Sequence, residues 1–125
     1  MKIICVGRNY NEHIRELRNN SPKEILFFLK PETAIPLKNQ PFFIPDFSNE
    51  IHHEIEIVIK INKTGKHIEE KFAKNYYNEL SVGVDFTARD IQEKLKSNQE
   101  PWEKAKAFDG SAAIGDFINK NSFED

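Results

Sequence analysis

Two glutamates, Glu54 and Glu56, are the first residues in this sequence whose types and spacing could do chemistry. They lie in the stretch His52–Ile61, HHEIEIVIKI, where isoleucine occupies every odd position from 55 to 61. This alternation predicts a β-strand with its apolar face buried. Because successive side chains point to opposite faces, both carboxylates project from one side of the strand, about 7 Å apart. Such a pair either faces water or binds a cation, and the strand alone favours solvated carboxylates.

A histidine and a glutamate near the start of the chain form a second candidate pair. From Asn11 the apolar residues follow helical spacing, which places His13 and Glu16 on one face at i, i+3. A histidine beside a carboxylate can act as a general base whose ring the carboxylate orients. The same spacing is common in surface pairs on short helices, and on its own it favours that alternative.

An aspartate and a lysine in the second half of the chain could also contribute. Asp85 stands at the carboxyl end of a predicted strand, Ser81–Phe86, directly before a predicted helix. Functional side chains are frequent there, although an aspartate can equally bond nearby backbone amides. Lys106 lies in a predicted loop over residues 100–110, where a solvated lysine is the simpler expectation.

The elements that must position these residues describe a small, β-rich chain. Strands are predicted over residues 2–6, Ile25–Leu29, His52–Ile61, Ser81–Phe86 and Ser111–Ile118. Helices are predicted from Asn11, over Ile68–Leu80, and from an N-cap at Thr87 to about Ser97. The four prolines from Pro31 to Pro45 indicate edge strands and loops.

Composition narrows the class of protein. The chain has 125 residues, of which 38% are apolar and 30% charged, and this predicts one soluble domain. A net charge of −2, with lysines scattered among acids, argues against a nucleic-acid partner. The single Cys5 lies within an apolar run, so we expect a buried structural thiol and a cytoplasmic location. We expect neither a signal peptide nor a membrane span, because every apolar run is short.

Five segments of the sequence, taken in order, resemble one enzyme family. They are CVGRNYNEHIREL, FFLKPETAI, IHHEIEIVIKI, VGVDFTARDIQ and PWEKAKAFDGSAA. Together they resemble the fumarylacetoacetate hydrolase family, particularly its small acylpyruvase-like members, over nearly the whole chain. The resemblance implies an α+β, β-rich fold in which a mixed β-sheet forms a roll with short peripheral helices. It also implies a homodimer.

The resemblance further implies roles for nine residues. Glu54, Glu56 and Asp85 would bind a divalent cation, His13 and Glu16 would form the base dyad, Lys106 would face the substrate, and Arg8, Arg89 and Gln92 would lie near it. Three carboxylates without a thiolate suit Mg²⁺, Mn²⁺ or Ca²⁺ better than zinc.

The activity implied is metal-dependent hydrolysis of a carbon–carbon bond in acylpyruvates or related β-diketo acids. The cation would stabilise negative charge on the substrate enolate, His13 would activate a water molecule, and Lys106 would hold a developing oxyanion or a carboxylate. Decarboxylation of 2-oxo acids and isomerisation of dienoates use the same metal platform and remain alternatives. A non-catalytic metal-binding domain is a third.

One departure from the family pattern concerns length. Family domains are longer, and their carboxyl-terminal half supplies further strands and a TGTP-like loop that this sequence lacks. We therefore expect residues 1–125 to be the amino-terminal portion of a single catalytic domain, truncated at its carboxyl end. The isoleucine face of the strand His52–Ile61 should then lack part of its cover and leave an exposed apolar patch.

Overall fold

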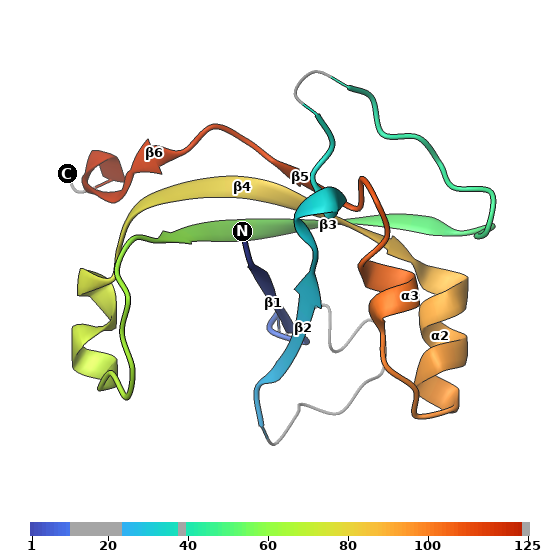
Figure 1. Cartoon of the computed structure of the whole chain (residues 1–125), viewed down its shortest axis with the longest axis horizontal. Coiled ribbons are helices and arrows are strands. Elements are labelled where there is room, and N and C mark those ends of the chain that lie inside the picture. The colour runs from blue at the N-terminus through green and yellow to red at the C-terminus, as the bar shows by residue number, and fades with distance from the viewer. Residues whose placement is uncertain (11–23, 38–39, 124–125) are drawn as a thin grey trace.

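A computed structural model of the chain describes residues 1–10, 24–37 and 40–123. Two antiparallel sheets and a few short helices make up this part of the chain (Figure 1). The strands are β1 (Ile3–Gly7), β2 (Leu26–Lys30), β3 (Ile51–Ile61), β4 (Tyr77–Ala88), β5 (Ala112–Ile114) and β6 (Ile118–Asn119). The helices are α2 (Arg89–Ser97) and α3 (Glu103–Lys106), and short 3-10 turns are η1 (Glu32–Ala34), η2 (Glu70–Asn75) and η3 (Lys120–Phe123). The predicted α+β, β-rich class is confirmed.

The larger sheet is organised on the long ribbon of β3 and β4. These strands pair antiparallel from Ile51 opposite Ala88 to Ile61 opposite Tyr77, with an irregularity at the Lys60/Ile61 step. β5 and β6 both pair with the other edge of β4. Since a register fixes which residues are neighbours across a sheet, this one places Glu54 directly opposite Asp85.

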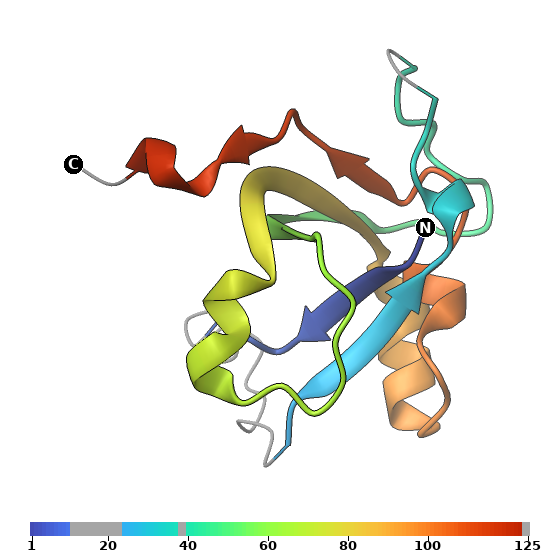
Figure 2. The same cartoon turned by 60° about the vertical axis from the view of Figure 1, so that its left-hand side comes forward.

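The smaller sheet consists of β1 and β2, paired antiparallel from Ile3 opposite Lys30 to Gly7 opposite Leu26. It lies beneath one face of the β3–β4 ribbon, and the two views agree on this placement (Figures 1 and 2). Cys5 belongs to this layer. The thiol is partly buried, not fully buried as expected. Its desolvation, followed by the nearby charge of Asp85, raises the pKa of the thiol to about 11, which disfavours the reactive thiolate.

Two helices close one end of the ribbon. α2 and α3 lie side by side there (Figure 1), and Leu95 and Ala105 pack with Ala88 at the end of β4 in a small buried cluster. α2 begins without a side-chain cap from Ala88, the residue before it. Instead, the carboxylate of Asp90 accepts hydrogen bonds from Ser48 and from the backbone N–H of Asn49. The start of α2 is thereby tied to the segment that leads into β3.

Several sequence-based predictions of local structure were wrong. No helix spans Ile68–Leu80, because η2 is a short 3-10 turn and β4 already begins at Tyr77. Thr87 is not the N-cap of α2 but a residue of β4. The predicted loop over residues 100–110 contains α3. The predicted strand Ser111–Ile118 is two short strands, β5 and β6, interrupted at residues 115–117. The predicted helix from Asn11 lies outside the described residues.

The isoleucine face of β3 is exposed, and the face with the glutamates is the inner one. Ile57 is 68% exposed and its cross-strand neighbour Val82 60%, while Glu54 and Glu56 are partly buried. The expectation of a buried isoleucine face is therefore wrong for the described residues. The reason is that β1 and β2 cover the opposite face. The exposed isoleucine row agrees with the expectation that this face of the strand leaves an exposed apolar patch.

We predict that this face drives self-association of a polypeptide consisting of residues 1–125. Ile57→Lys should shift its sizing-chromatography profile toward the monomer, because it places a charge in the middle of the exposed row without disturbing a buried contact. Thr64→Lys, at an exposed loop position after the end of β3, is the matched control and should leave the profile unchanged. A wild-type chain that elutes as a monomer at all concentrations would contradict this prediction.

Candidate active site

One pocket between the two sheets and α2 gathers most of the residues expected to form the site. Its lining includes seven of the nine: Arg8, Glu54, Glu56, Asp85, Arg89, Gln92 and Lys106. His13 and Glu16 lie outside the described residues. β1 and the turn after it, the inner face of β3, the end of β4 and one face of α2 each contribute side chains. The pocket therefore depends on contacts between segments far apart in the sequence.

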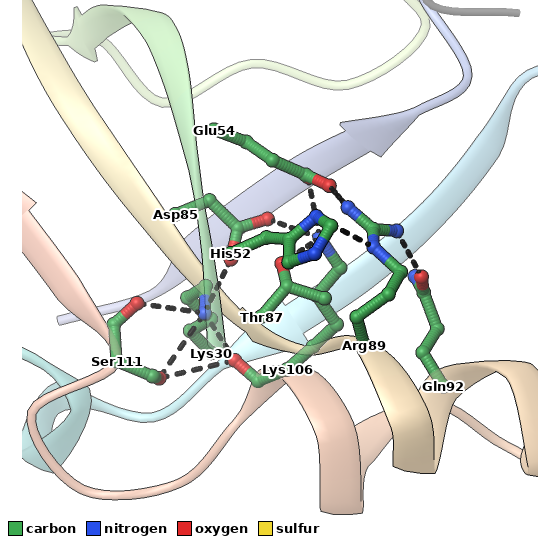
Figure 3. A network of polar contacts seen from close by, with 9 residues as sticks. All are labelled: Lys30, His52, Glu54, Asp85, Thr87, Arg89, Gln92, Lys106 and Ser111. Atoms are coloured by element: carbon green, nitrogen blue, oxygen red, sulfur yellow. Dashed lines mark hydrogen bonds and ion pairs between the residues drawn. The ribbon is translucent and has the colours of Figure 1, made fainter. Parts of the chain in front are cut away.

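Lys106 lies at the centre of the polar network in this pocket (Figure 3). Its ammonium donates to Glu54 Oε2 at 2.6 Å, Asp85 Oδ2 at 2.7 Å and Thr87 Oγ1 at 2.6 Å. An ammonium has three N–H groups, so these bonds use all of them. The side chain is almost completely buried, and it extends from α3 toward the facing pair on β3 and β4. The expectation of a solvated loop lysine is therefore wrong.

A second buried lysine, Lys30 at the end of β2, holds the other side of Asp85. Its ammonium lies 2.9 Å from Asp85 Oδ1, so the two form a buried ion pair. Lys30 also donates to the carbonyl and hydroxyl oxygens of Ser111, at 3.0 and 3.1 Å, and to the carbonyl of Lys106. Burial lowers the pKa of Lys30, and Asp85 only partly offsets this effect.

Arg89, the first residue of α2, binds the remaining oxygen of Glu54. Its guanidinium donates to Glu54 Oε1, to Gln92 Oε1 on the next turn of the helix, and to His52 Nδ1 at 3.3 Å (Figure 3). Burial would raise the pKa of Glu54, but the charges and hydrogen bonds of Lys106 and Arg89 outweigh it and lower that pKa. Glu54 is thus held as a carboxylate.

Glu56 has a different environment from Glu54. Its pKa is raised, chiefly by burial and further by the negative charges of Asp85 and Glu54, while a hydrogen bond with Tyr10 and the charge of Lys106 act in the opposite direction. A carboxyl group in that position gains from any additional cation. Glu56 is therefore the acid of the three that is least compensated by the protein itself.

The donor chemistry of the pocket fits a hard divalent cation. Glu54, Glu56 and Asp85 supply only carboxylate oxygens, the ligands that such cations prefer. Within the described part of the chain, however, no three acidic, histidine or cysteine side chains lie close enough together to enclose a metal ion. The ammonium of Lys106 is the cation that joins Glu54 to Asp85 in this arrangement.

Comparison with known proteins identifies the family. The model of the fumarylacetoacetate hydrolase carboxyl-terminal domain matches residues 2–125. The chain belongs to the fumarylacetoacetate hydrolase family. The oxaloacetate tautomerase YcgM of Escherichia coli (strain K12) is 40% identical over 122 residues, which are 98% of this chain and 56% of that protein. A mitochondrial oxaloacetate decarboxylase of Dictyostelium discoideum is 41% identical over 125 residues, 99% of this chain and 57% of that protein.

Solved structures of the fumarylacetoacetate hydrolase family have the same fold. A family protein of Yersinia pestis CO92 superposes with a TM-score of 0.91 at 42% identity, covering 99% of this chain and 57% of that one. Fumarylpyruvate hydrolase of Pseudomonas aeruginosa, in complex with Mn²⁺ and pyruvate, gives 0.89 at 35% identity, covering 98% and 55%. The chain thus spans little more than half the length of the relatives that it matches.

Three residues in or beside the candidate site were not predicted from the sequence: Lys96 and Trp102, which line the pocket, and the buried Lys30, which contacts Asp85. Lys30 had no signal beyond its position after an apolar strand, because nothing in the sequence indicates that its ammonium is buried. Trp102 falls within the predicted loop over residues 100–110, where no pattern distinguishes it from its neighbours. Lys96 could have been found, since it follows Arg89 and Gln92 at i+7 and i+4 and so shares their helix face.

We predict that Lys106 stabilises the metal-free protein by compensating Glu54 and Asp85. Lys106→Met replaces the lysine with an apolar side chain of similar length and removes the cation that balances both carboxylates. This should lower the free energy of unfolding by on the order of 3 kcal/mol. Urea unfolding in the presence of EDTA measures this cost. The exposed Lys104 of the same helix provides the control, Lys104→Met, which should change stability by less than about 0.5 kcal/mol. Equal effects of the two variants would contradict this role.

Proposed function

We propose that the protein is a divalent-metal-dependent enzyme that cleaves a carbon–carbon bond in acylpyruvates or related β-diketo acids. The single observation that carries this proposal is the pocket itself, where three carboxylates face a set of arginine and lysine side chains. Carboxylates suit a metal, and the cations suit an anionic substrate. Family membership supports an enzymatic role, since the relatives named above are tautomerases, decarboxylases and hydrolases.

Glu54, Glu56 and Asp85 are the residues that would hold Mg²⁺ or Mn²⁺, with Ca²⁺ a further candidate. When bound, such a cation acts as a Lewis acid that stabilises negative charge on a carbonyl oxygen. The Pseudomonas aeruginosa relative was solved with Mn²⁺ and pyruvate, which supports a divalent metal and a 2-oxo acid at the corresponding site here.

The protein's own groups would bind the substrate and move its protons. Arg89 is fixed by Gln92 and Glu54, so its guanidinium is oriented before a substrate carboxylate arrives. Lys106 would stabilise an oxyanion through the charge of its buried ammonium, since its three N–H groups are already bonded to Glu54, Asp85 and Thr87. His13, oriented by Glu16, would take a proton from the attacking water. The roles of His13 and Glu16 rest on their match to the family motif.

Tautomerisation or decarboxylation of oxaloacetate is the second candidate activity. The names of the relatives from Escherichia coli and Dictyostelium discoideum favour it. Both chemistries need stabilisation of an enolate, which the same carboxylates and cations would supply. Turnover of acetylpyruvate against turnover of oxaloacetate, each with Mg²⁺, separates the two. Absence of both activities, with metal binding intact, would favour a non-catalytic metal-binding domain.

Two further features of the proposal remain predictions. A cytoplasmic location rests on the single Cys5, and the homodimer rests on the family resemblance. No helix in the part of the chain that the structure describes is both long enough and apolar enough to cross a membrane. The activity is proposed for the whole protein, and the relatives that the chain matches are nearly twice as long as these 125 residues.

We predict that Mn²⁺ raises the melting temperature of the natural protein and that Glu56→Ala removes this rise. A ligand that binds only the folded state at 100 times its dissociation constant stabilises it by about 2.7 kcal/mol. Glu93→Ala, which removes an exposed acid from α2, is the control and should keep the full response. The metal assignment fails if Glu56→Ala responds to Mn²⁺ as the wild type does.

We predict that His13→Ala lowers kcat by about 10² to 10⁴ while the dissociation constant for Mn²⁺ stays within about twofold of wild type. A general base acts in the transition state and does not bind the cation, so turnover and metal affinity should separate. Steady-state kinetics and calorimetric titration of Mn²⁺ provide the two measurements. Near-normal turnover in His13→Ala would refute the assignment.

A further inference from the structure

His52 lies beside the pocket, outside its lining, and contacts Arg89 from there (Figure 3). The Arg89 Nε–H donates to His52 Nδ1 at 3.3 Å, and the other ring nitrogen, Nε2, lies 2.8 Å from Glu50 Oε1. The His52 side chain is 45% exposed, whereas that of Arg89 is only 4% exposed. A histidine at the surface therefore contacts a buried cation of the candidate site.

Two features of the chain bring His52 to Arg89. His52 and Glu54 are two residues apart in β3 and so share its inner face. Arg89 directly follows β4, and its backbone N–H donates to the carbonyl oxygen of Glu50 at 2.8 Å. This bond holds the start of α2 beside the start of β3. The Arg89 guanidinium is thereby kept within reach of the imidazole.

The two contacts of His52 determine where the imidazole carries its hydrogen. A guanidinium can only donate, so Nδ1 accepts from Arg89 and carries no hydrogen. The ring hydrogen then lies on Nε2, which donates it to Glu50 Oε1. Glu50 therefore holds the tautomer that the contact with Arg89 requires.

Three acceptors hold the Arg89 guanidinium, and His52 is the one that binds Nε. Gln92 and Glu54 each accept from one terminal nitrogen. These bonds leave one N–H on each terminal nitrogen without an acceptor among the described residues. Two N–H groups on neighbouring nitrogens can bind one carboxylate bidentately. Because His52 occupies Nε, these terminal groups are what Arg89 offers to a ligand in the pocket.

We propose that His52 is a positioning residue, which holds Arg89 Nε so that the terminal N–H groups stay directed at the substrate. Without the imidazole, the buried Nε–H would lose its acceptor, and the guanidinium would turn to recover one. His52 would then influence substrate affinity and leave the chemical step unchanged. The substrate-binding part of this inference rests on the proposed function, in which Arg89 binds a substrate carboxylate.

A surface ion pair is the simpler role for an exposed histidine and glutamate. Such a pair contributes little to stability, because water screens it. The contact with Arg89 differs, since a buried donor that loses its acceptor is unfavourable. The two roles predict different results: replacing a mere surface residue would leave substrate affinity unchanged, whereas replacing a positioning residue would lower it.

Variants that keep one ring nitrogen at a time provide the test. In His52→Asn the side-chain oxygen can take the position of Nδ1 and accept from Arg89, whereas in His52→Gln the side-chain nitrogen can take the position of Nε2 and donate to Glu50. His52→Phe removes both nitrogens and keeps a ring. His53→Phe is the matched control, because His53 is exposed and lies on the opposite face of β3.

Steady-state kinetics with acetylpyruvate and oxaloacetate are measured on the whole protein loaded with Mn²⁺. We expect His52→Phe and His52→Gln to raise KM by about tenfold while kcat stays within about threefold of wild type, because the lost interaction is made before the chemical step. KM in His52→Asn should stay within about threefold of wild type, and His53→Phe should behave as wild type. The dissociation constant for Mn²⁺ should change by less than about twofold in every variant, since Lys106 still binds Glu54.

Three kinetic results would overturn the inference. They are an unchanged KM in His52→Phe, an equal rise in His53→Phe, and a rise in His52→Asn as large as that in His52→Phe. A joint loss of kcat and Mn²⁺ affinity in His52→Phe would indicate a general structural role and would also overturn it.

Hydrogen exchange at Arg89 Nε distinguishes failure of this inference from failure of the proposed function. If the wild type turns over neither acetylpyruvate nor oxaloacetate, the proposed function fails, and the positioning of Arg89 is decided by exchange of its Nε–H, followed by ¹⁵N NMR. Exchange at least about tenfold faster in His52→Phe than in His53→Phe would support the positioning role. Equal exchange in the two variants would overturn it.

Discussion

The pairing of Glu54 with Asp85 across β3 and β4 is the constraint on which the rest of this site depends. Two carboxylates facing each other inside a protein repel each other. Cations from three other segments balance their charge: Lys30 from β2, Lys106 from α3 and Arg89 from α2. Each of these contacts also joins one element to the central ribbon. The charges that make the site chemically capable are therefore the same interactions that hold the smaller sheet and the helices in place.

The cations around Asp85 both balance its charge and join neighbouring elements, and their contacts form one continuous network. Lys30 reaches Ser111 and the carbonyl of Lys106 as well as Asp85, so it fixes the turn that follows α3. Breaking a buried ion pair costs more than the pair itself contributes, because the remaining charge has no partner. The position of Lys106 is consequently determined from both of its ends, by the backbone at α3 and by its ammonium at Glu54 and Asp85.

The family resemblance implied nine site residues, of which seven line one pocket in the structure, whereas less of the local structure could be predicted from sequence. The strand that carries Glu54 and Glu56 was found because alternation is a strong signal. The four-residue spacing of Phe72, Tyr76 and Leu80 is typical of a helix. However, Leu80 lies in β4 and pairs with Ile59 of β3, so sheet pairing overrode the local pattern. α3 is only four residues long and too short to leave a periodic signal. The burial of Lys30 arises only when the two sheets meet, and no local pattern can express it.

The two faces of β3 separate the chemistry of this protein from its packing. The glutamates point toward the smaller sheet and the pocket, whereas the isoleucines from 55 to 61 point away from both. Because successive residues of a strand alternate strictly, whatever covers the isoleucine row contacts the opposite side of the ribbon from the pocket. Apolar cover can therefore be added to this face without blocking the pocket. It would also stiffen the ribbon on which the spacing of Glu54, Glu56 and Asp85 depends.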